Sequence, residues 1–306
     1  MKVYLSKINE SWIIDRIRNE WYEKNNIHST KFINKSDIIW IISPWLWKKI
    51  PKRYLKSKKV LCSIYHIDFD TFSDSDYKDF QELDQFVDHY HVISKKTKIA
   101  LSKLTEKKIT SIPLWVNPDN WFYIQDKKKL RSEFGFSENQ YLIGSFQRDT
   151  EGSDLKSPKL IKGPDIFFEI IQKQYKTNKN LMVILTGKRR QYLINKFDVH
   201  KIPYRYFEMV NLENLNKLYN ILDLYVVSSR LEGGPQAIVE CGLVKTPIIS
   251  TDVGIASEIL SKTSIYSDIN NLGVPDVKVA YENSLKLAIP NGMTKYLNLF
   301  RRMHEN

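Results

Sequence analysis

The residues best suited to chemistry lie in one segment, Ser228–Glu258, where a glycine-rich turn stands between two glutamates. Glu232 and Glu240 are separated by seven residues, among them Gly233, Gly234 and Pro235. Proline suits the first turn of a helix, because its missing N–H would be unpaired there. A helix N-terminus offers free N–H groups and positive partial charge, and glycines let the backbone approach a ligand. The segment therefore predicts a site for a diphosphate.

The two glutamates predict contacts with hydroxyl groups. A carboxylate at Glu232 would repel phosphate unless it faces another group, such as sugar hydroxyls. Glu240 lies roughly 7–8 Å further along the expected helix, which suits a ribose diol. The alternative is that Glu232 is an ordinary acidic residue near a helix start and Glu240 a surface position. Against that, the neighbours of Glu240 are apolar, which predicts a helix buried nearly all round and a carboxylate that needs partners.

This segment resembles the donor motif of GT-B-fold retaining glycosyltransferases of the family 4 type (glycosyl transferases group 1). The resemblance rests on Ser229–Gly242, on Thr246–Gly254 and on Glu258, in this order. It implies that Glu240 binds the ribose and that Glu232 lies by the donor sugar and phosphates. It also implies that the backbone of Gly233, Gly234 and Pro235 caps the diphosphate.

The resemblance further implies a cationic pair, Arg148 and Lys162, for the nucleotide diphosphate. In the family a strand, a glycine and a basic residue are followed by Lys-Gly, and Gly144, Arg148 and Lys162 match these positions. Fixed cations would stabilise the charge on the departing diphosphate. This chain departs from the usual spacing, because Arg148 follows Gly144 by four residues and an insertion, Asp149–Leu160, precedes Lys162. In a chain with 47 Lys+Arg, a basic residue is otherwise a solvated surface charge.

Further positions match loops of the family. Gly187 ends an expected strand, and the triplet Lys188–Arg190 is either a base or phosphate contact or a helix start on the surface. Met209 lies in the loop that resembles the family's base-contacting loop. His66 ends an expected strand of the first domain, where it either contacts the sugar or acceptor or is an ordinary histidine. The loop Ser6–Ser11 lacks the glycines that many relatives carry there.

Short β-rich runs alternate with helical patterns, which is typical of parallel sheets covered on both faces. The expected strands are Lys2–Leu5, Asp37–Ile42, Lys59–Tyr65, Asp88–Ile93, Lys108–Ile112, Tyr141–Phe146, Leu181–Thr186, Tyr204–Phe207, Leu224–Ser228, Thr246–Ser250 and Ser264–Tyr266. The expected helices are Ser11–Asn25, a short one after Pro44, Tyr77–Gln85, Lys95–Leu104, Pro164–Thr177, Arg189–Phe197, Leu212–Leu222 and Pro235–Leu243.

About ten such units exceed one domain, so the predicted fold class is α/β, GT-B, with two Rossmann-like doubly wound parallel-sheet domains facing a cleft. The break is expected at Val116–Trp121 or in the charged run Gln125–Arg131. The expected domains are an N-terminal acceptor domain, 1–118, and a C-terminal nucleotide-sugar donor domain, 119–284. A C-terminal helix of about 285–306 is expected to pack back on the first domain.

The bulk properties are those of an ordinary globular protein, with 42% hydrophobic and 27% charged residues among 306. The two cysteines are far apart, which favours a reducing compartment. The longest apolar run, Ile38–Trp47, is interrupted by Pro44 and is shorter than a membrane span of about 20 residues. The N-terminal apolar run is too short for a signal peptide. A cytoplasmic location is therefore expected.

The net charge of +12 has two interpretations, solvated lysines along the chain or an anionic partner. The basic and aromatic segment Trp45–Lys59 could place tryptophans at a membrane interface and lysines on anionic headgroups. Otherwise it is a solvated basic helix whose aromatic residues pack inward. Peripheral contact at the membrane surface is thus one expectation for this segment, and no nucleic-acid partner is expected.

The function that the resemblance implies is transfer of a sugar, with retention and without a metal, from a nucleotide-diphosphate donor to an acceptor hydroxyl. The donor is a substrate, and no permanently bound cofactor is expected. The acceptor would be a glycan, a lipid-linked sugar or a small molecule. No Asp-x-Asp metal motif occurs in the donor domain, and Asp68-Phe69-Asp70 is acceptor-side or incidental. The alternatives are a GT-B nucleotide-sugar-binding protein with lost or different chemistry, such as an epimerase, and a basic nucleic-acid-binding protein.

Overall fold

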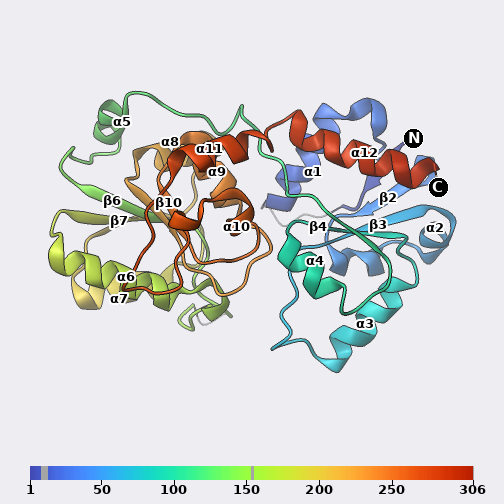
Figure 1. Cartoon of the computed structure of the whole chain (residues 1–306), viewed down its shortest axis with the longest axis horizontal. Helices are drawn as coiled ribbons and strands as arrows, with labels where there is room; N and C mark the ends of the chain where they lie inside the picture. The colour runs from blue at the N-terminus through green and yellow to red at the C-terminus, as the bar shows by residue number, and fades with distance from the viewer. Residues whose placement is uncertain (8–12, 153–154, 306) are drawn as a thin grey trace. The chain divides into compact units, whose positions relative to one another are not determined.

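The computed structural model describes residues 1–7, 13–152 and 155–305. The chain divides into two compact units, one formed by Met1–Trp115 with Ile289–Asn306 and the other by Val116–Ala288. We call them unit 1 and unit 2 and describe each by itself (Figure 1). Residues 8–12, which include the last part of the loop Ser6–Ser11 and the start of the helix expected at Ser11–Asn25, lie outside the described residues.

Unit 1 is built on a parallel sheet of five strands in the order β1-β2-β3-β4-β5. Its elements are β1 (Val3–Leu5), α1 (Ile13–Lys24), η1 (Asn26–His28), η2 (Ile33–Lys35), β2 (Ile38–Ile41), η3 (Pro44–Lys49), α2 (Lys52–Ser57), β3 (Lys59–Ile64), α3 (Asp74–Asp84), β4 (His89–Val92), α4 (Lys95–Leu101), β5 (Lys108–Ser111) and α12 (Asn291–Glu305).

The core of unit 1 joins segments from both ends of the chain. Trp40 of β2 lies 5.2 Å from Tyr296 and 5.5 Å from Phe300 of α12, ring centroid to ring centroid. His91 of β4 is fully buried between them, with its ring nitrogens 2.8 Å from the Ser63 hydroxyl and 2.8 Å from the Ile112 carbonyl oxygen. Burial lowers the pKa of His91 to about 4, so the ring is neutral near pH 7. These contacts give His91 a structural role in the core.

Unit 2 has a second five-stranded parallel sheet in the order β10-β9-β6-β7-β8. Its elements are α5 (Lys127–Glu133), β6 (Tyr141–Ser145), η4 (Leu160–Lys162), α6 (Pro164–Thr177), β7 (Leu181–Thr186), α7 (Gln191–His200), β8 (Tyr204–Phe207), α8 (Leu212–Ile221), β9 (Leu224–Val227), α9 (Gln236–Val244), β10 (Ile248–Ser250), α10 (Ala256–Ile259), η5 (Lys262–Ser264) and α11 (Val277–Leu285).

Helices cover both faces of this sheet, because alternate residues of its strands are apolar on opposite sides. Leu142 of β6 belongs to the core shared with α8, α9 and α11, whereas Ile143 belongs to the core shared with α6 and α7. Figure 1 shows these two groups of helices on opposite faces of the sheet. The sheet is therefore doubly wound, and its connecting loops lie at the carboxyl and amino ends of the strands.

The two parallel-sheet α/β units confirm the predicted fold class. The strand expected at Ser264–Tyr266 is wrong, because Ser264 lies in η5 and Ile265 forms only an isolated bridge with Ser250. The charged run Gln125–Arg131, which the sequence offers as a domain break, overlaps the helix α5 of unit 2.

The domain boundaries expected at 118/119 and at about 285 stay predictions. The chain passes from unit 1 to unit 2 at Trp115 and returns after Ala288, and α12 belongs to unit 1. Within the described residues, no helix combines the length and the apolar character needed to cross a membrane.

Candidate functional site

The candidate donor site lies on unit 2, at the carboxyl ends of the parallel strands of its sheet. Ligands of open α/β sheets bind at this carboxyl edge. The loops that leave the strands there carry four of the predicted residues: Arg148 follows β6, Gly187 follows β7, Met209 follows β8 and Glu232 follows β9. The sheet thus collects at one edge residues that are far apart in the sequence.

Lys162 and Glu232 meet directly. The Lys162 ammonium forms an ion pair with Oε1 of Glu232, and both side chains are largely buried, with 24% and 13% of their surface exposed. The two residues are 70 positions apart in the sequence. A lysine held beside a carboxylate at a helix N-terminus is a cation that an incoming diphosphate could contact.

The loop that carries Lys162 fits closely against the loop after β9. Gly163 has φ 61°, and a Cβ atom there would lie 1.8 Å from the carbonyl oxygen of Ser228. The Ser228 hydroxyl donates to the Gly163 carbonyl at 2.8 Å, and the Arg230 amide donates to the Ile161 carbonyl at 2.9 Å. Glycine is required at position 163 because no side chain fits between these two loops. The close approach of these two loops therefore explains the glycine of the Lys-Gly pair.

Gln147 and Ser229, which the sequence analysis did not assign to the site, connect the two loops. The Gln147 amide nitrogen donates to the Lys162 carbonyl at 2.8 Å. The Ser229 hydroxyl lies 3.2 Å from Oε1 of Gln147 and 3.2 Å from Oε1 of Glu232. Thr251 donates its hydroxyl to the Ser229 carbonyl at 2.6 Å, which fixes the turn from the side of β10.

The turn Gly233–Pro235 leads into α9, whose N-terminus has no side-chain cap. The helix begins at Gln236, and Pro235 is its N-cap residue instead of its first helical residue. Neither Gly233 nor Gly234 has a positive φ, so what they contribute is the lack of a side chain. Gly254 has φ 50°, and a Cβ atom there would lie 2.2 Å from the Gly233 carbonyl oxygen. The uncapped N–H groups of α9 suit an anion.

Glu240 lies inside α9 and is 5% exposed, which agrees with the predicted burial of this helix. The Tyr219 hydroxyl of α8 donates to its Oε2 at 2.9 Å. Burial and the Glu240 carboxylate raise the pKa of Tyr219 well above its ordinary value, so this hydroxyl stays protonated and remains a donor. Tyr219 also packs against Phe146, with ring centroids 4.9 Å apart. The orientation of Glu240 is thus set by an aromatic neighbour.

The other predicted donor-site residues lie on or near the same edge. Arg148 is exposed, and its Nε donates to the Thr150 carbonyl at 2.7 Å. Gly187 has φ 85° and accepts a hydrogen bond from the Tyr206 hydroxyl, and Met209 is 62% exposed.

Gly144 lies inside β6, where a Cβ atom would lie 2.4 Å from Leu222. Packing therefore accounts for glycine at position 144, and its contact with a donor stays a prediction.

A buried ion pair lies between the ends of β6 and β7. Nε of Arg190 lies 2.8 Å from Oδ2 of Asp149, and the two side chains are 0% and 2% exposed. In the sequence, Arg190 stands in the basic triplet Lys188–Arg190, and nothing local marks Asp149 as its partner. Opposite charges at the ends of two neighbouring strands are the only signal that could have revealed this pair.

On unit 1, His66 is exposed and follows β3, as predicted. Asp68 and Asp70 form a turn, in which the Asp70 amide donates to the Asp68 carboxylate at 3.2 Å. The described part of the chain contains no group of three or more His, Cys, Asp or Glu side chains arranged to hold a metal ion.

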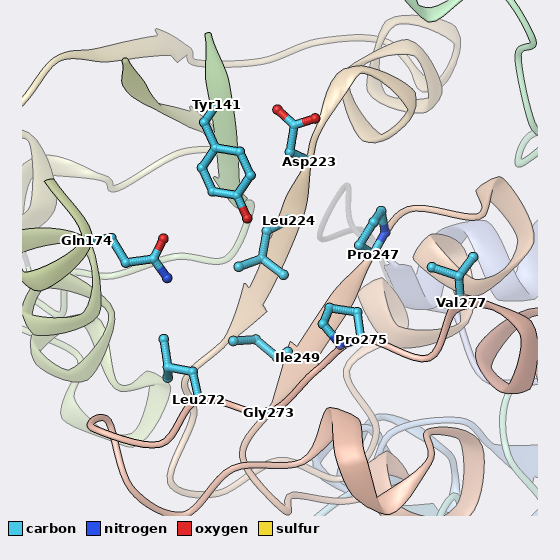
Figure 2. A pocket seen from close by; sticks show the side chains of 10 residues that line it. All are labelled: Tyr141, Gln174, Asp223, Leu224, Pro247, Ile249, Leu272, Gly273, Pro275 and Val277. Atoms are coloured by element: carbon cyan, nitrogen blue, oxygen red, sulfur yellow. The ribbon is translucent and has the colours of Figure 1, made fainter. Parts of the chain in front are cut away.

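A cavity of about 380 Å³ lies elsewhere in unit 2 (Figure 2). Its lining includes Tyr141 and Leu224, the first residues of β6 and β9, so it lies at the amino edge of the sheet. Asp223 in its wall already binds Lys127, Arg131 and the Leu142 amide. We do not assign the donor to this cavity, because Lys162 and the N-terminus of α9, which has no side-chain cap, lie at the opposite end of the strands.

Comparison with known proteins agrees with this architecture. Residues 157–270 match the family model described as "Glycosyl transferases group 1". The curated relative "O-antigen biosynthesis glycosyltransferase WclY" of Escherichia coli is 25% identical over 149 residues, which are 48% of this chain and 39% of that protein. The chain thus spans well under half the length of this relative.

Solved structures resemble the whole chain. Anabaena Alr3699/HepE in complex with UDP is 12% identical, with a TM-score of 0.74 over 98% of this chain and 99% of that one. A glycosyltransferase from Rickettsia africae is 17% identical, with a TM-score of 0.65 over 98% of this chain and 84% of that one.

The class that the two units define is the GT-B fold. The family match gives the more specific result, because it covers the strands and loops that carry Lys162, Glu232 and Glu240. These findings confirm the predicted resemblance to GT-B-fold glycosyl transferases group 1.

Proposed function

We propose that this protein transfers a sugar from a nucleotide-diphosphate donor to an acceptor hydroxyl, with retention at the anomeric carbon and without a metal. The observation that carries the proposal is the ion pair of Lys162 and Glu232 beside the uncapped N-terminus of α9. The family match over these loops supports it. The complexes of Anabaena HepE with UDP and with UDP-glucose support a nucleotide-sugar donor.

Lys162 and the N–H groups of α9 would carry the charge of the leaving group. When the bond between sugar and diphosphate breaks, negative charge grows on the departing oxygen, and fixed donors stabilise it without reorganisation. The donor's diphosphate would share the Lys162 ammonium with Glu232. Arg148 is exposed and donates from its Nε to the Thr150 carbonyl, so its terminal nitrogens could contribute a second cationic contact.

The two glutamates would then have separate tasks. Glu232, anchored by Lys162 and Ser229, would contact the donor sugar, whereas Glu240 would accept hydrogen bonds from the ribose diol. Tyr219 holds one oxygen of Glu240, so the carboxylate is oriented before the nucleotide binds. In a retaining transfer of this kind the acceptor hydroxyl attacks from the face that the diphosphate leaves, and no covalent nucleophile is needed.

The acceptor would contact unit 1, and His66 is the candidate residue there. The name of the Escherichia coli relative, an O-antigen biosynthesis enzyme, supports a glycan or lipid-linked acceptor. A cytoplasmic location remains part of this proposal.

Contact of Trp45–Lys59 with an anionic membrane stays a prediction. Trp47 is 5% exposed and packs against Phe86, whereas Trp45 is 48% exposed beside a run of lysines. Sedimentation with vesicles that contain anionic lipid, compared between the wild type and Trp45→Ala, tests this contact. A protein that does not sediment at moderate salt contradicts it.

A thermal-shift screen with UDP, GDP, ADP and their sugar conjugates tests the donor site. A ligand that binds only the folded protein raises its melting temperature by mass action. We expect at least one diphosphate to stabilise the wild type, and Glu240→Gln to lose most of that shift. Glu213→Gln on α8 is the matched control, since this glutamate is exposed and pairs with Lys217 on the surface. The donor site is refuted if no nucleotide shifts the wild type.

Product analysis separates transfer from the alternative chemistries. With a nucleotide sugar that shifts the wild type, a transferase should release free nucleoside diphosphate faster when an acceptor is added. Formation of an epimeric sugar without an acceptor would favour an epimerase. Binding without any product would favour a protein that has lost its chemistry.

A further inference from the structure

The ion pair of Arg190 and Asp149 joins two neighbouring strands at their carboxyl ends. Arg190 contacts Asp149 through Nε. Its Nη1 donates to the Ser145 carbonyl at 2.6 Å and to the Thr186 carbonyl at 2.9 Å. Ser145 is the last residue of β6, and Thr186 is the last residue of β7. One guanidinium thus holds the points at which both strands open into the loops of the candidate site.

Hydrogen bonds to the backbone next to the ion pair also join the loop after β6 to the loop after β7. The amides of Asp149 and Thr150 both donate to the Arg189 carbonyl, at 3.0 and 3.2 Å, and the Thr150 hydroxyl donates to it at 3.0 Å. Arg189 has φ 62° and Gly187 has φ 85°, so this loop follows a path that most residues avoid. Residues in such sparsely populated backbone conformations cluster at functional sites.

Stability alone does not account for the pair. Burying two charges costs several kcal/mol per ion, and apolar residues of similar volume often serve as well. Burial raises the pKa of the Asp149 carboxyl more than Arg190 lowers it, so the fold does not favour this carboxylate. One Nη of Arg190 also has no hydrogen-bond partner among the described residues. What the pair provides is geometry, because a planar guanidinium fixes several acceptors at once.

The residues next to Asp149 in the sequence connect the ion pair to the candidate donor site. Gln147, which binds the Lys162 carbonyl and faces Ser229, lies two positions before Asp149. Arg148 lies between them, and its guanidinium is fixed by Thr150. A displacement of Asp149 would therefore move Gln147 and Arg148 together.

We infer that Arg190 and Asp149 are positioning residues that hold the loops after β6 and β7 in the shape required to bind the diphosphate of the donor. The inference rests on the proposed function. Neither side chain touches the ligand in this scheme, since both are buried. The pair keeps Gln147 and Arg148 in place before the nucleotide arrives.

The test replaces the pair by apolar residues of similar size, Arg190→Met together with Asp149→Leu, in the full chain. The matched control is Arg131→Met together with Asp223→Leu, which removes a similar pair at the amino edge of the same sheet. There Arg131 binds Asp223 and the carbonyls of Ile221, Glu138 and Gln140 (Asp223 is labelled in Figure 2). UDP, GDP and ADP are titrated by calorimetry, and melting temperatures are recorded.

We expect the first double variant to bind the preferred diphosphate about tenfold more weakly while remaining folded, and the control to keep the wild-type affinity. Affinity within about twofold of the wild type in the folded first variant overturns the inference, as does an equal loss in the control. A wild type that binds no diphosphate refutes the proposed function instead.

Hydrogen exchange on the nucleotide-free wild type gives a second measurement that needs no variant. We expect slow exchange at the amides of Asp149 and Thr150, because the loop is ordered in advance. Fast exchange at both amides overturns the inference, whether or not the double variants fold.

Discussion

At the scale of single residues, the site depends on a few polar side chains that share partners. Lys162 binds Glu232, Glu232 lies near Ser229, and Ser229 lies near Gln147. The backbone of Lys162 closes the ring through Gln147. Because every member has a partner within the group, removal of one changes the position of the others, and single substitutions need matched controls.

Lys162→Ala is expected to lower kcat by about 100- to 1000-fold, because a fixed cation at the leaving group is lost. Steady-state kinetics with the nucleotide sugar identified in the thermal-shift screen measures this. Lys159→Ala is the control, since this lysine lies in the same turn but pairs with Glu151, on the surface. Equal rates in the two variants would refute the role of Lys162.

Tyr219→Phe is expected to weaken nucleotide binding by about tenfold, because Glu240 loses the hydroxyl that orients its carboxylate. Calorimetric titration with the diphosphate checks this. Tyr266→Phe serves as control, since the Tyr266 hydroxyl is also buried and donates to the Val227 carbonyl, in the core on the other face of the sheet. If both variants bind like the wild type, Glu240 does not need Tyr219.

At the scale of elements, the site depends on how closely the connecting loops approach one another. The turn before α6 and the turn before α9 touch through Gly163 and Ser228, and the turn after β10 touches Gly233 through Gly254. Helix periodicity and turn residues indicate where each helix begins. These sequence features do not indicate that the three turns contact each other. The contact follows from the strand order β10-β9-β6, which only the structure shows.

Gly163→Ala is expected to cost more stability than Gly135→Ala and to weaken nucleotide binding as well. Both glycines have positive φ, at 61° and 74°, so an alanine costs about 1–2 kcal/mol at either position. Only at position 163 does the new Cβ also meet a backbone oxygen, that of Ser228 at 1.8 Å. Chemical unfolding and nucleotide titration of both variants measure the difference. Equal losses would show that the two loops can separate at no cost.

At the scale of the whole molecule, the two units respond to different conditions. Nucleotide binding is proposed for unit 2, whereas the buried histidine His91 lies in unit 1. Six of the seven tryptophans precede Val116, so tryptophan fluorescence reports mainly on unit 1. The two responses can therefore be measured separately in the full chain.

Acid is expected to destabilise unit 1 through His91. Its pKa is lowered to about 4 in the folded protein from 6.5, so at pH 5 the unfolded chain binds more protons. The stabilisation is complete above about pH 6.5 and is lost as the pH falls toward about 4.

Between pH 7 and pH 5 the wild type should lose about 2 kcal/mol more than His91→Asn, measured by urea unfolding followed by fluorescence. His89, whose pKa burial also lowers to about 4, remains in both proteins and cancels in the comparison. Equal losses in the two proteins would contradict the neutral state of His91.

The sequence by itself determined the fold class and most of the elements. Apolar runs separated by amphipathic segments require parallel sheets covered by helices, and α6 begins and ends where the pattern predicts, at Pro164 and Thr177. The sequence also selected Lys162, Glu232 and Glu240, because glycine, proline and charged residues in a fixed order are a local property of the chain. The strand predicted at Ser264–Tyr266 is wrong, because this segment forms only one isolated bridge, between Ile265 and Ser250.

Only the tertiary structure decided which of these residues meet. The partner of Lys162 is 70 positions away, and the partner of Arg190 is 41 positions away. Gln147 and Asp149 carry no local signal, and the contacts of Ser229, which lies in the motif, also arise from neighbours that the sequence does not indicate. The physical reason is that a parallel sheet brings together loops in the order of its strands, which differs from their order along the chain. Spacing in the sequence therefore selects the candidate residues, while strand order in space brings them together in the candidate site.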